Sequence, residues 1–320
     1  MNARPPASLS LDLDNLWSYM KIHGDAGWES HPSYLDALAE IVTDRLRRHR
    51  LTLTIFVVGQ DAALEKNQRA LRRLAEDGHD IGNHSFSHEP WFHTYAYADV
   101  AREIGQAEQA IERATGTRPR GFRGPGFSIS ADTLRVLGER GYIYDASTFP
   151  TFLGPLARTY YFWKTDSMSP EERKKRKQLF GKAGEGLRPL QPYLWDLPDH
   201  RLLEIPVTTM PIARTPFHMS YLLYLSGFSA PLARTYLRSA LALCRLRGVQ
   251  PSFLLHPLDF LGGDCVKELA FFPGMKLKTE HKLALFDDLV AIIKSSFEPV
   301  TMAEHARRLL ANGNLRSRSL

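Results

Sequence analysis

The chain has 320 residues, of which 43% are hydrophobic and 24% are charged. These values are ordinary for a globular protein and exclude a disordered, collagen-like or disulfide-stabilised chain. The net charge of +6 favours anionic partners, such as phosphate groups, nucleic acid or a lipid surface, although a mildly basic globular protein has the same balance. Because no zinc finger or aromatic-basic RNA motif is present, we expect no nucleic-acid partner.

The two cysteines, Cys244 and Cys265, form no CxxC pair, which excludes a zinc ribbon and a thioredoxin-like motif. Residues 1–10 lack the apolar segment of a secretory signal, so we expect a cytoplasmic protein. No apolar run of about 18 residues predicts a membrane span. The apolar stretch 217–228 is too short to cross a bilayer, and it is expected to form a buried helix or a peripheral lipid contact.

Short apolar strands alternate with amphipathic helices along most of the chain. In chain order the pattern predicts strands at residues 9–13, 51–58, 120–123, 142–145, 201–207, 252–255 and 298–300, and helices at residues 34–48, 67–77, 98–115, 131–140, 233–247, 280–295 and 302–311. This alternation predicts an α/β fold with a mainly parallel sheet. Periodicity does not separate an open sheet from a closed barrel.

Residues 149–200 interrupt the alternation, because they are rich in proline, glycine, aromatic and charged residues. A segment of this length without a clear period predicts an insertion or a lid on a single domain formed by residues 1–320. The basic run 173–177 within it is expected to form a solvated surface or a contact with phosphate or anionic lipid.

Two histidines stand out in the segment GHDIGNHSFSH, residues 78–88. His84 and His88 are four residues apart, so a helical turn would place both imidazoles on one face. Paired imidazoles suit a transition metal. The spacing alone is weak, because the chain has twelve histidines.

Asp12 and Asp14 end the first predicted strand, where residues two apart share a face. Neighbouring carboxylates repel unless a metal or a proton separates them. A division of labour, in which one carboxylate binds metal and the other acts as a base, removes this cost. A solvent-exposed pair or a helix cap is the alternative.

Two further segments contain chemically useful residues. The sequence from Arg123 to Phe127, Arg-Gly-Pro-Gly-Phe, predicts either a tight loop that brings backbone N–H groups near a substrate oxygen or an ordinary turn. His256 ends an apolar strand, where a buried structural histidine is as well explained as a catalyst.

The order of these segments resembles the polysaccharide deacetylases of the NodB type, carbohydrate esterase family 4. The resemblance runs from about Ser8 to Pro257, and it includes residues 141–147, which resemble the family block after the arginine motif. It implies the family's distorted (β/α)7 barrel. It also implies one divalent metal, with zinc as the first choice and cobalt, nickel or iron as metals that fit the same ligands.

The resemblance also implies a role for each site residue. The implied metal ligands are Asp14, His84 and His88. The implied catalytic residues are Asp12 as general base, Arg123 to orient it, His256 as general acid and Asp145 to tune His256, while the backbone at Gly126 and the side chain of Phe127 would contact the substrate and its oxyanion.

The sequence departs from the family pattern at two places. Leu13 separates the two acids, Asn15 follows them, and Gly126 stands where an aromatic residue usually follows the proline. These changes leave the substrate less certain than the metal. The pair His256-Pro257 followed by Asp259 resembles the exopolysaccharide-associated, intracellular branch.

The resemblance implies removal of an acetyl or formyl group from an amino sugar. The basic run 173–177, the apolar stretch 217–228 and the lack of a signal suggest a lipid-linked or nucleotide-linked sugar, or a polysaccharide, and a contact with an anionic membrane. Hydrolysis of a small cyclic amide or imide is the alternative for the same site. A non-catalytic, metal-stabilised glycan-binding module is the alternative from another class.

Overall fold

The computed structural model describes residues 4–152 and 186–319. The basic run 173–177 and most of the predicted insertion lie outside the described residues. The expectation of one domain with a lid therefore stays a prediction.

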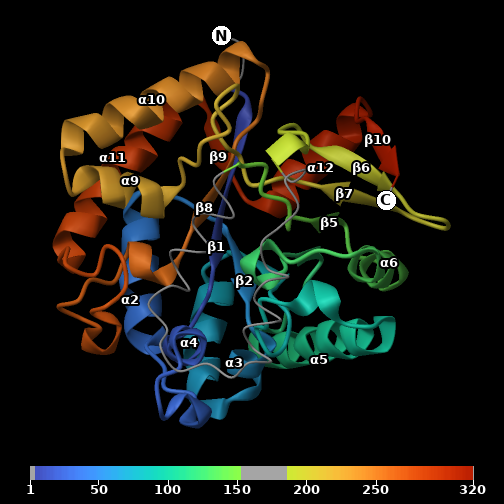
Figure 1. Ribbon diagram of the computed structural model, residues 1–320, viewed down its shortest axis with the longest axis horizontal. Coiled ribbons are helices and arrows are strands. Elements are labelled where there is room, and N and C mark those ends of the chain that lie inside the picture. The colour runs from blue at the N-terminus through green and yellow to red at the C-terminus, as the bar shows by residue number, and fades with distance from the viewer. Residues whose placement is uncertain (1–3, 153–185, 320) are drawn as a thin grey trace.

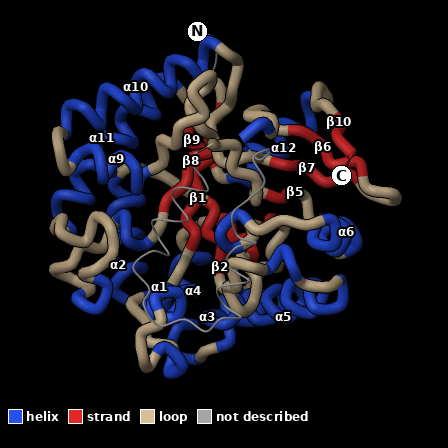
Figure 2. The backbone as a smooth tube through the Cα atoms, in the orientation of Figure 1, coloured by secondary structure: helices blue, strands red, loops and turns tan. Residues whose placement is uncertain are grey.

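The described part of the chain forms one large sheet (Figure 1 and Figure 2). Its strands are β1 (Pro6–Asp12), β2 (Thr54–Val57), β3 (Asp80–Asn83), β4 (Gly121–Phe122), β5 (Tyr144–Asp145), β6 (Tyr193–Asp196), β7 (Arg201–Glu204), β8 (Ser252–Leu255), β9 (Glu298–Val300) and β10 (Ser317–Ser319). The order is β10-β6-β7-β5-β4-β3-β2-β1-β8, with β9 paired to β1. The β6–β7 pair is antiparallel, whereas β1 runs parallel to β2, β8 and β9.

The sheet curves into a distorted barrel. The segment that follows β7 lies beside β8. There the N–H of Thr208 donates a hydrogen bond of 3.0 Å to the carbonyl of Ser252. The strands β1–β5, β7 and β8 therefore enclose the barrel of the expected (β/α)7 type. This contact joins distant parts of the chain, which is why periodicity could not choose between an open and a closed sheet.

Most of the helices lie outside the barrel, whereas α12 (Met302–Asn312) packs against the strand face that carries Ser8 and Arg123. The helices are α1 (Leu16–His23), α2 (Leu35–Arg48), α3 (Gly59–Ala63), α4 (Glu65–Glu76), α5 (Tyr97–Thr115), α6 (Ala131–Glu139), α9 (Met219–Ser226), α10 (Ala230–Leu246), α11 (Thr279–Ser296) and α12, with short 3-10 turns η1 (Trp28–Ser30), η2 (Phe92–Thr94), η3 (Pro125–Phe127), η5 (Pro257–Asp259) and η6 (Lys267–Leu269). In Figure 1, α2 and α9–α11 lie on one flank and α5 and α6 on the other.

Apolar and polar residues alternate in β1 although both faces of this strand are buried. Leu9 and Leu11 belong to the largest apolar core. The intervening Ser8, Ser10 and Asp12 bond to side chains inside the barrel. The pattern therefore predicted the strand, while its polar side is the interior of the barrel and not the solvent.

The pattern did not predict β3, which contains one aliphatic residue, Ile81. A Cβ at Gly82 would lie 2.5 Å from the ring of Phe56 in β2. The strand therefore depends on a glycine for close packing, and glycine weakens the strand pattern.

The apolar stretch 217–228 forms α9 and the turn after it. Met219, Leu222 and Leu223 are buried, whereas Tyr224 is 64% exposed and Phe228 is 72% exposed. The stretch is thus a core helix with one exposed apolar end. Within the described residues, no helix has the length and apolarity needed to cross a membrane.

A buried histidine in α12 makes stability depend on pH. His305 lies between Ser8 and Gln250, with ring nitrogens 3.0 and 2.8 Å from their oxygens. Burial, helped by the charge of Arg308, lowers the pKa of His305 to about 4. The unfolded chain binds this proton near pH 6.5, so the contribution of His305 to stability is present above pH 6.5 and falls as pH decreases toward 4.

We predict that His305→Gln reduces the loss of unfolding free energy between pH 7.5 and pH 5.5 by about 1 kcal/mol. Urea unfolding of the wild type and the variant at both pH values measures this difference. The pH dependence contributed by all other groups is the same in both proteins and cancels. The control is His281→Gln, at an exposed histidine of α11. An unchanged pH dependence in His305→Gln would show that this histidine is protonated equally in both states.

Candidate active site

Three candidate metal ligands meet at the carboxyl ends of β1 and β3. Asp14 follows β1, and His84 and His88 follow β3, with β2 between the two strands. The Nε2 atoms of His88 and His84 lie 2.9 and 3.5 Å from Oδ1 of Asp14. One ligand atom from each residue lies within 4.8 Å of the others. Apart from these two ring nitrogens, Oδ1 of Asp14 has no hydrogen-bond partner among the described residues, so all three atoms are available to a cation. This donor set fits zinc and its neighbours among the divalent transition metals.

The expected helical turn between the histidines is wrong. Residues 84–88 form a loop in which Ser85 and His88 have left-handed φ angles of 63° and 53°. The backbone N–H groups of Phe86 and Ser87 donate to the Glu103 carboxylate of α5, at 3.1 and 2.9 Å. This buried carboxylate, and not helical spacing, brings the two imidazoles together.

The orientation of His84 is fixed by a backbone contact. Its Nδ1 lies 2.6 Å from the carbonyl of Arg123, so Nδ1 carries the proton and donates it. The lone pair of Nε2 then faces Asp14. Although burial disfavours the carboxylate of Asp14, the adjacent imidazoles of His88 and His84 hold its pKa well below the ordinary value. A metal ligand must be deprotonated in this way.

Asn15 explains part of the departure from the family pattern. Its Oδ1 accepts from the N–H of Leu16 and caps α1. Its Nδ2 donates to Oδ1 of Asp61 at 2.7 Å and to Ser33 at 2.9 Å. Burial raises the pKa of Asp61 to about 7. This network anchors the loop that contains Asp14.

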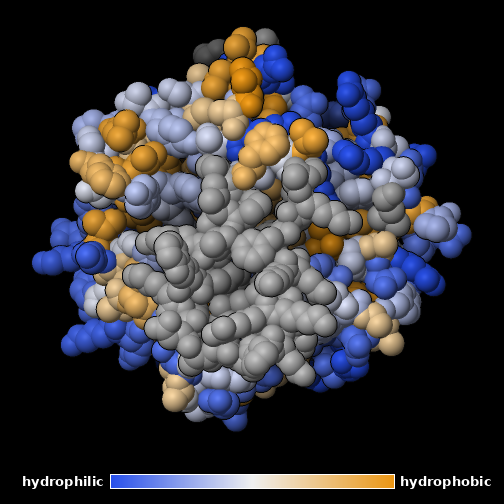
Figure 3. Space-filling model, viewed as in Figure 1, coloured by the Kyte–Doolittle hydropathy of each residue, from blue (hydrophilic) through white to orange (hydrophobic). Residues whose placement is uncertain are grey.

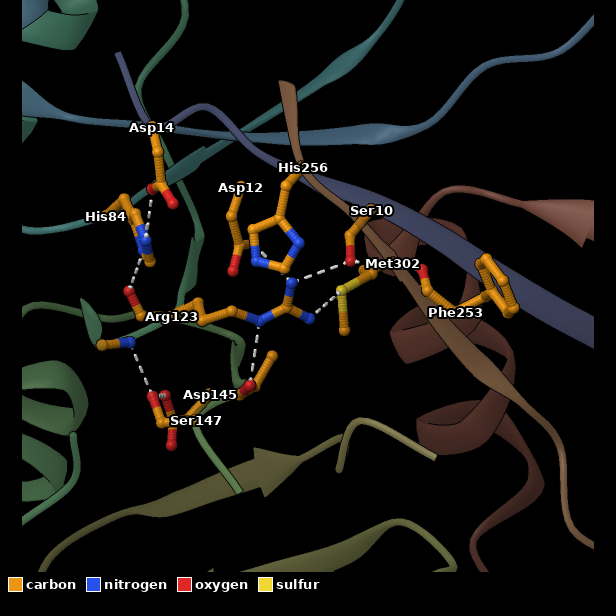
Figure 4. Close-up of polar contacts among 12 residues, drawn as sticks. Ser10, Asp12, Asp14, His84, Arg123, Asp145, Ser147, Phe253, His256 and Met302 are labelled. Carbon is orange, nitrogen blue, oxygen red and sulfur yellow. Dashed lines mark hydrogen bonds and ion pairs between the residues drawn. The ribbon is translucent and has the colours of Figure 1, made fainter. Parts of the chain in front are cut away.

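The other carboxylate of the pair, Asp12, faces Arg123. The guanidinium is completely buried, and its Nη1 donates to Oδ1 of Asp12 at 2.6 Å and to Ser10 at 2.8 Å (Figure 4). Its Nε donates to the carbonyl of Ala146 at 3.0 Å, and Nη2 lies 3.5 Å from Sδ of Met302. Ser10 and Met302 are partners of Arg123 that the sequence analysis missed. Ser10 could have been found, because it lies two residues before Asp12 on the same face of β1, whereas no local pattern indicated Met302.

The structure does not place Asp145 beside His256. Its Oδ1 accepts from Ser147, whose hydroxyl oxygen accepts from the N–H of Gly124 at 2.8 Å, so Asp145 supports the arginine loop. Asp145 also lies next to the buried Glu204, and burial together with the charge of Asp145 raises the pKa of Glu204.

The residues beside His256 are Ser220 and Asp259. The backbone N–H of His256 donates to Oδ2 of Asp259 at 2.7 Å, and Ser220 donates to Oδ1 at 2.8 Å. The Ser220 hydroxyl also lies 3.5 Å from Nδ1 of His256. In the parallel pairing of β1 and β8, Leu11 lies opposite Leu255, so the next residues, Asp12 and His256, lie at the same end of neighbouring strands. His256 therefore lies on the strand next to that of Asp12, and its contacts are with Ser220 and Asp259.

The loop after β4 presents two left-handed residues in succession. Gly126 has a φ of 58° and Phe127 a φ of 62°. A left-handed backbone at a bulky residue is strained, and such strain is concentrated at functional sites. Gly126 is exposed and Phe127 is partly buried, on the same loop as Arg123.

Comparison with known proteins shows that part of the chain around this site is similar to a known family. Residues 25–144, which include His84, His88 and Arg123, match the family model described as polysaccharide deacetylase. The chain is 29% identical over 102 residues to a peptidoglycan-N-acetylglucosamine deacetylase of Bacillus cereus, which is 32% of this chain and 36% of the relative. It is 34% identical over 113 residues to a chitooligosaccharide deacetylase of Azorhizobium caulinodans, which is 35% of this chain and 50% of the relative. The chain thus spans about a third to a half of these relatives.

The whole fold also has a structural counterpart. The crystal structure of a candidate polysaccharide deacetylase from Mycobacterium smegmatis superposes with a TM-score of 0.62. The match covers 99% of this chain and 98% of the other at 17% sequence identity. The similarity shows that the two chains share a fold.

We predict that the purified protein binds about one Zn²⁺ per chain and that His84→Ala weakens this binding more than about 100-fold. Loss of an outer contact of a metal ligand typically costs 10–100-fold, and a lost ligand costs more. Titration calorimetry after chelator treatment measures the affinity. His93→Ala is the matched control, because His93 lies outside the cluster and bonds to Ser128. If His84→Ala bound zinc as tightly as the wild type, the assignment of this cluster as the metal site would be rejected.

We predict that Arg123→Met lowers the unfolding free energy by roughly 3–5 kcal/mol, since it leaves the Asp12 carboxylate buried without its partner. In the double variant with Asp12→Asn, the loss should be smaller than the sum of the single losses by at least about 1 kcal/mol. Urea unfolding of the four proteins measures this coupling. Additive losses would mean that the 2.6 Å contact contributes nothing specific.

Proposed function

We propose that this chain is a metal-dependent hydrolase that removes an acetyl or formyl group from the nitrogen of an amino sugar, since residues 25–144 match the polysaccharide deacetylase family model. The observation that carries this proposal is the convergence of Asp14, His84 and His88 beside the Asp12–Arg123 pair. The named relatives act on N-acetylated carbohydrates, which supports this substrate class.

The three ligands would hold one divalent metal. Such a metal polarises a carbonyl as a Lewis acid and makes water a better nucleophile at neutral pH. Three protein ligands are typical of catalytic sites, because they leave coordination positions for water and substrate. Zinc is the first choice, and cobalt, nickel or iron fit the same ligands.

The chain's own groups would move the protons. Asp12 accepts a proton from the attacking water as the oxygen bonds to the acyl carbon. Arg123 keeps Asp12 aimed, since its other N–H groups are fixed by Ser10 and Ala146. A backbone N–H near Gly126 would stabilise the oxyanion, a contact typically worth about 3 kcal/mol.

His256 would complete the reaction. As the C–N bond breaks, the imidazole gives its proton to the departing amine, and the products are a carboxylate and a free amino sugar. Ser220, which contacts the ring, and Asp259, which accepts from the backbone N–H, hold His256 in place. A binding module would need neither a buried carboxylate–arginine pair nor a partly exposed histidine beside it, so these groups favour an enzyme.

The proposal also concerns the carrier to which the amino sugar is attached. A lipid-linked sugar would bring a hydrophobic chain near the protein, and the exposed Tyr224 and Phe228 offer an apolar surface. A nucleotide-linked sugar or a polysaccharide is the alternative carrier. A peripheral membrane contact and a cytoplasmic location stay predictions.

We predict that Asp12→Asn retains zinc and lowers the rate of acetate release by 10²–10⁴-fold, the usual range for a lost general base. His84→Ala should lose both metal and activity. Acetate and formate release from N-acylated chito-oligosaccharides and peptidoglycan fragments measures turnover, with His93→Ala as the control. Full activity in Asp12→Asn would reject its role, and release from a cyclic imide alone would indicate the alternative reaction.

A further inference from the structure

Four aromatic rings form a continuous row beside His256. Phe127 lies 4.7 Å from Phe149, which lies 5.6 Å from His218, and His218 lies 4.7 Å from Tyr221, all between ring centroids. The ring of His218 is 6.1 Å from that of His256. We call Phe127, Phe149, His218 and Tyr221 the aromatic row.

The row is assembled from three distant segments. Phe127 ends η3, Phe149 follows β5, and His218 and Tyr221 are at the start of α9. Ser220, between these two, bonds to Asp259 and so links α9 to the turn that contains His256. Phe127, Phe149 and Tyr221 are only partly buried, so they retain accessible ring surface.

His218 is the unusual member of the row. Its side chain is buried, with 7% exposure, and its Nδ1 has no hydrogen-bond partner among the described residues. Burial lowers the pKa of His218 to about 3, so the imidazole is neutral and has one donor and one acceptor. An unsatisfied buried polar atom is costly, and a ligand group that forms a hydrogen bond with it removes that cost.

The chemistry of the proposed reaction places the sugar on this side. The amine that leaves is attached to the sugar ring, and His256 is the group that would protonate it. The acyl group must lie toward Asp14 and the histidines, so the ring that bears the amine lies toward His256 and the aromatic row. A pyranose has an apolar C–H face and hydroxyls at its edge, which suits aromatic rings with one well-placed polar group.

We propose that the aromatic row is a sugar-binding subsite, in which Phe127 and Phe149 contact the apolar face of a pyranose and His218 forms a hydrogen bond with one of its hydroxyl or acetamide groups. This inference rests on the proposed function. It assigns substrate recognition to Phe149, His218 and Tyr221 in addition to Phe127.

The test measures binding separately from turnover. Tetra-N-acetylchitotetraose is titrated by calorimetry into zinc-loaded Asp12→Asn protein, in which hydrolysis is slowed. Adding His218→Phe keeps the ring volume and removes the hydrogen bond, and we expect the Kd to rise about 10-fold or more. His218→Gln, which can still form a hydrogen bond, should recover part of the loss. Phe149→Leu should raise the Kd several-fold.

The control is Leu246→Ala, at an exposed apolar position of α10 that has no part in the proposed site. An unchanged Kd in both His218→Phe and Phe149→Leu would overturn the subsite, as would a failure of the tetrasaccharide to bind. If His218→Phe does not fold, Phe149→Leu and His218→Gln still decide the question. Acetate release with a Kd insensitive to His218 would reject the subsite alone, whereas binding that depends on His218 without acetate or formate release would reject the proposed reaction alone.

Discussion

The buried guanidinium of Arg123 is the interaction on which the site depends. A charge without solvent must find a partner for each N–H group, and here the partners come from β1, from the residue after β5 and from α12. The ring of Phe56 in β2 lies 4.4 Å below it. The backbone carbonyl of Arg123 accepts a hydrogen bond from His84. One side chain thus aims the candidate base, and its backbone sets the tautomer of a candidate metal ligand.

The loops at the carboxyl ends of the strands contain strained backbone conformations, which contacts with neighbouring helices and loops stabilise. Ser85, His88 and Phe127 all have left-handed backbones in these loops. The carboxylate of Glu103 accepts from the histidine loop, and Ser147 accepts from the arginine loop. Rigid strands and helices therefore supply the partners that keep a strained loop in one conformation, as preorganised sites require.

The two sides of the site differ in character. On one side, Asp14 and two imidazoles suit a cation, and the network of Asn15 and Asp61 anchors them. On the other side, His256 lies beside aromatic rings and the neutral His218. This division matches a substrate with a polar acyl group that must be activated and a sugar ring that must be positioned.

The sequence by itself determined the α/β class, most of the helices, and the identity of Asp12, Asp14, His84, His88, Arg123 and His256 as the residues to examine. It could do so because burial leaves a local period and because chemically reactive residues stood in short, ordered segments. Only the tertiary structure decided that the sheet closes through Thr208 and Ser252, that the histidines lie on a loop anchored by Glu103, and that Asp259 accompanies His256. It alone brought His218 and Phe149 to the site. Periodicity reports the environment of a residue along its own strand or helix, whereas the partner of a buried polar group is set by packing between segments far apart in the chain.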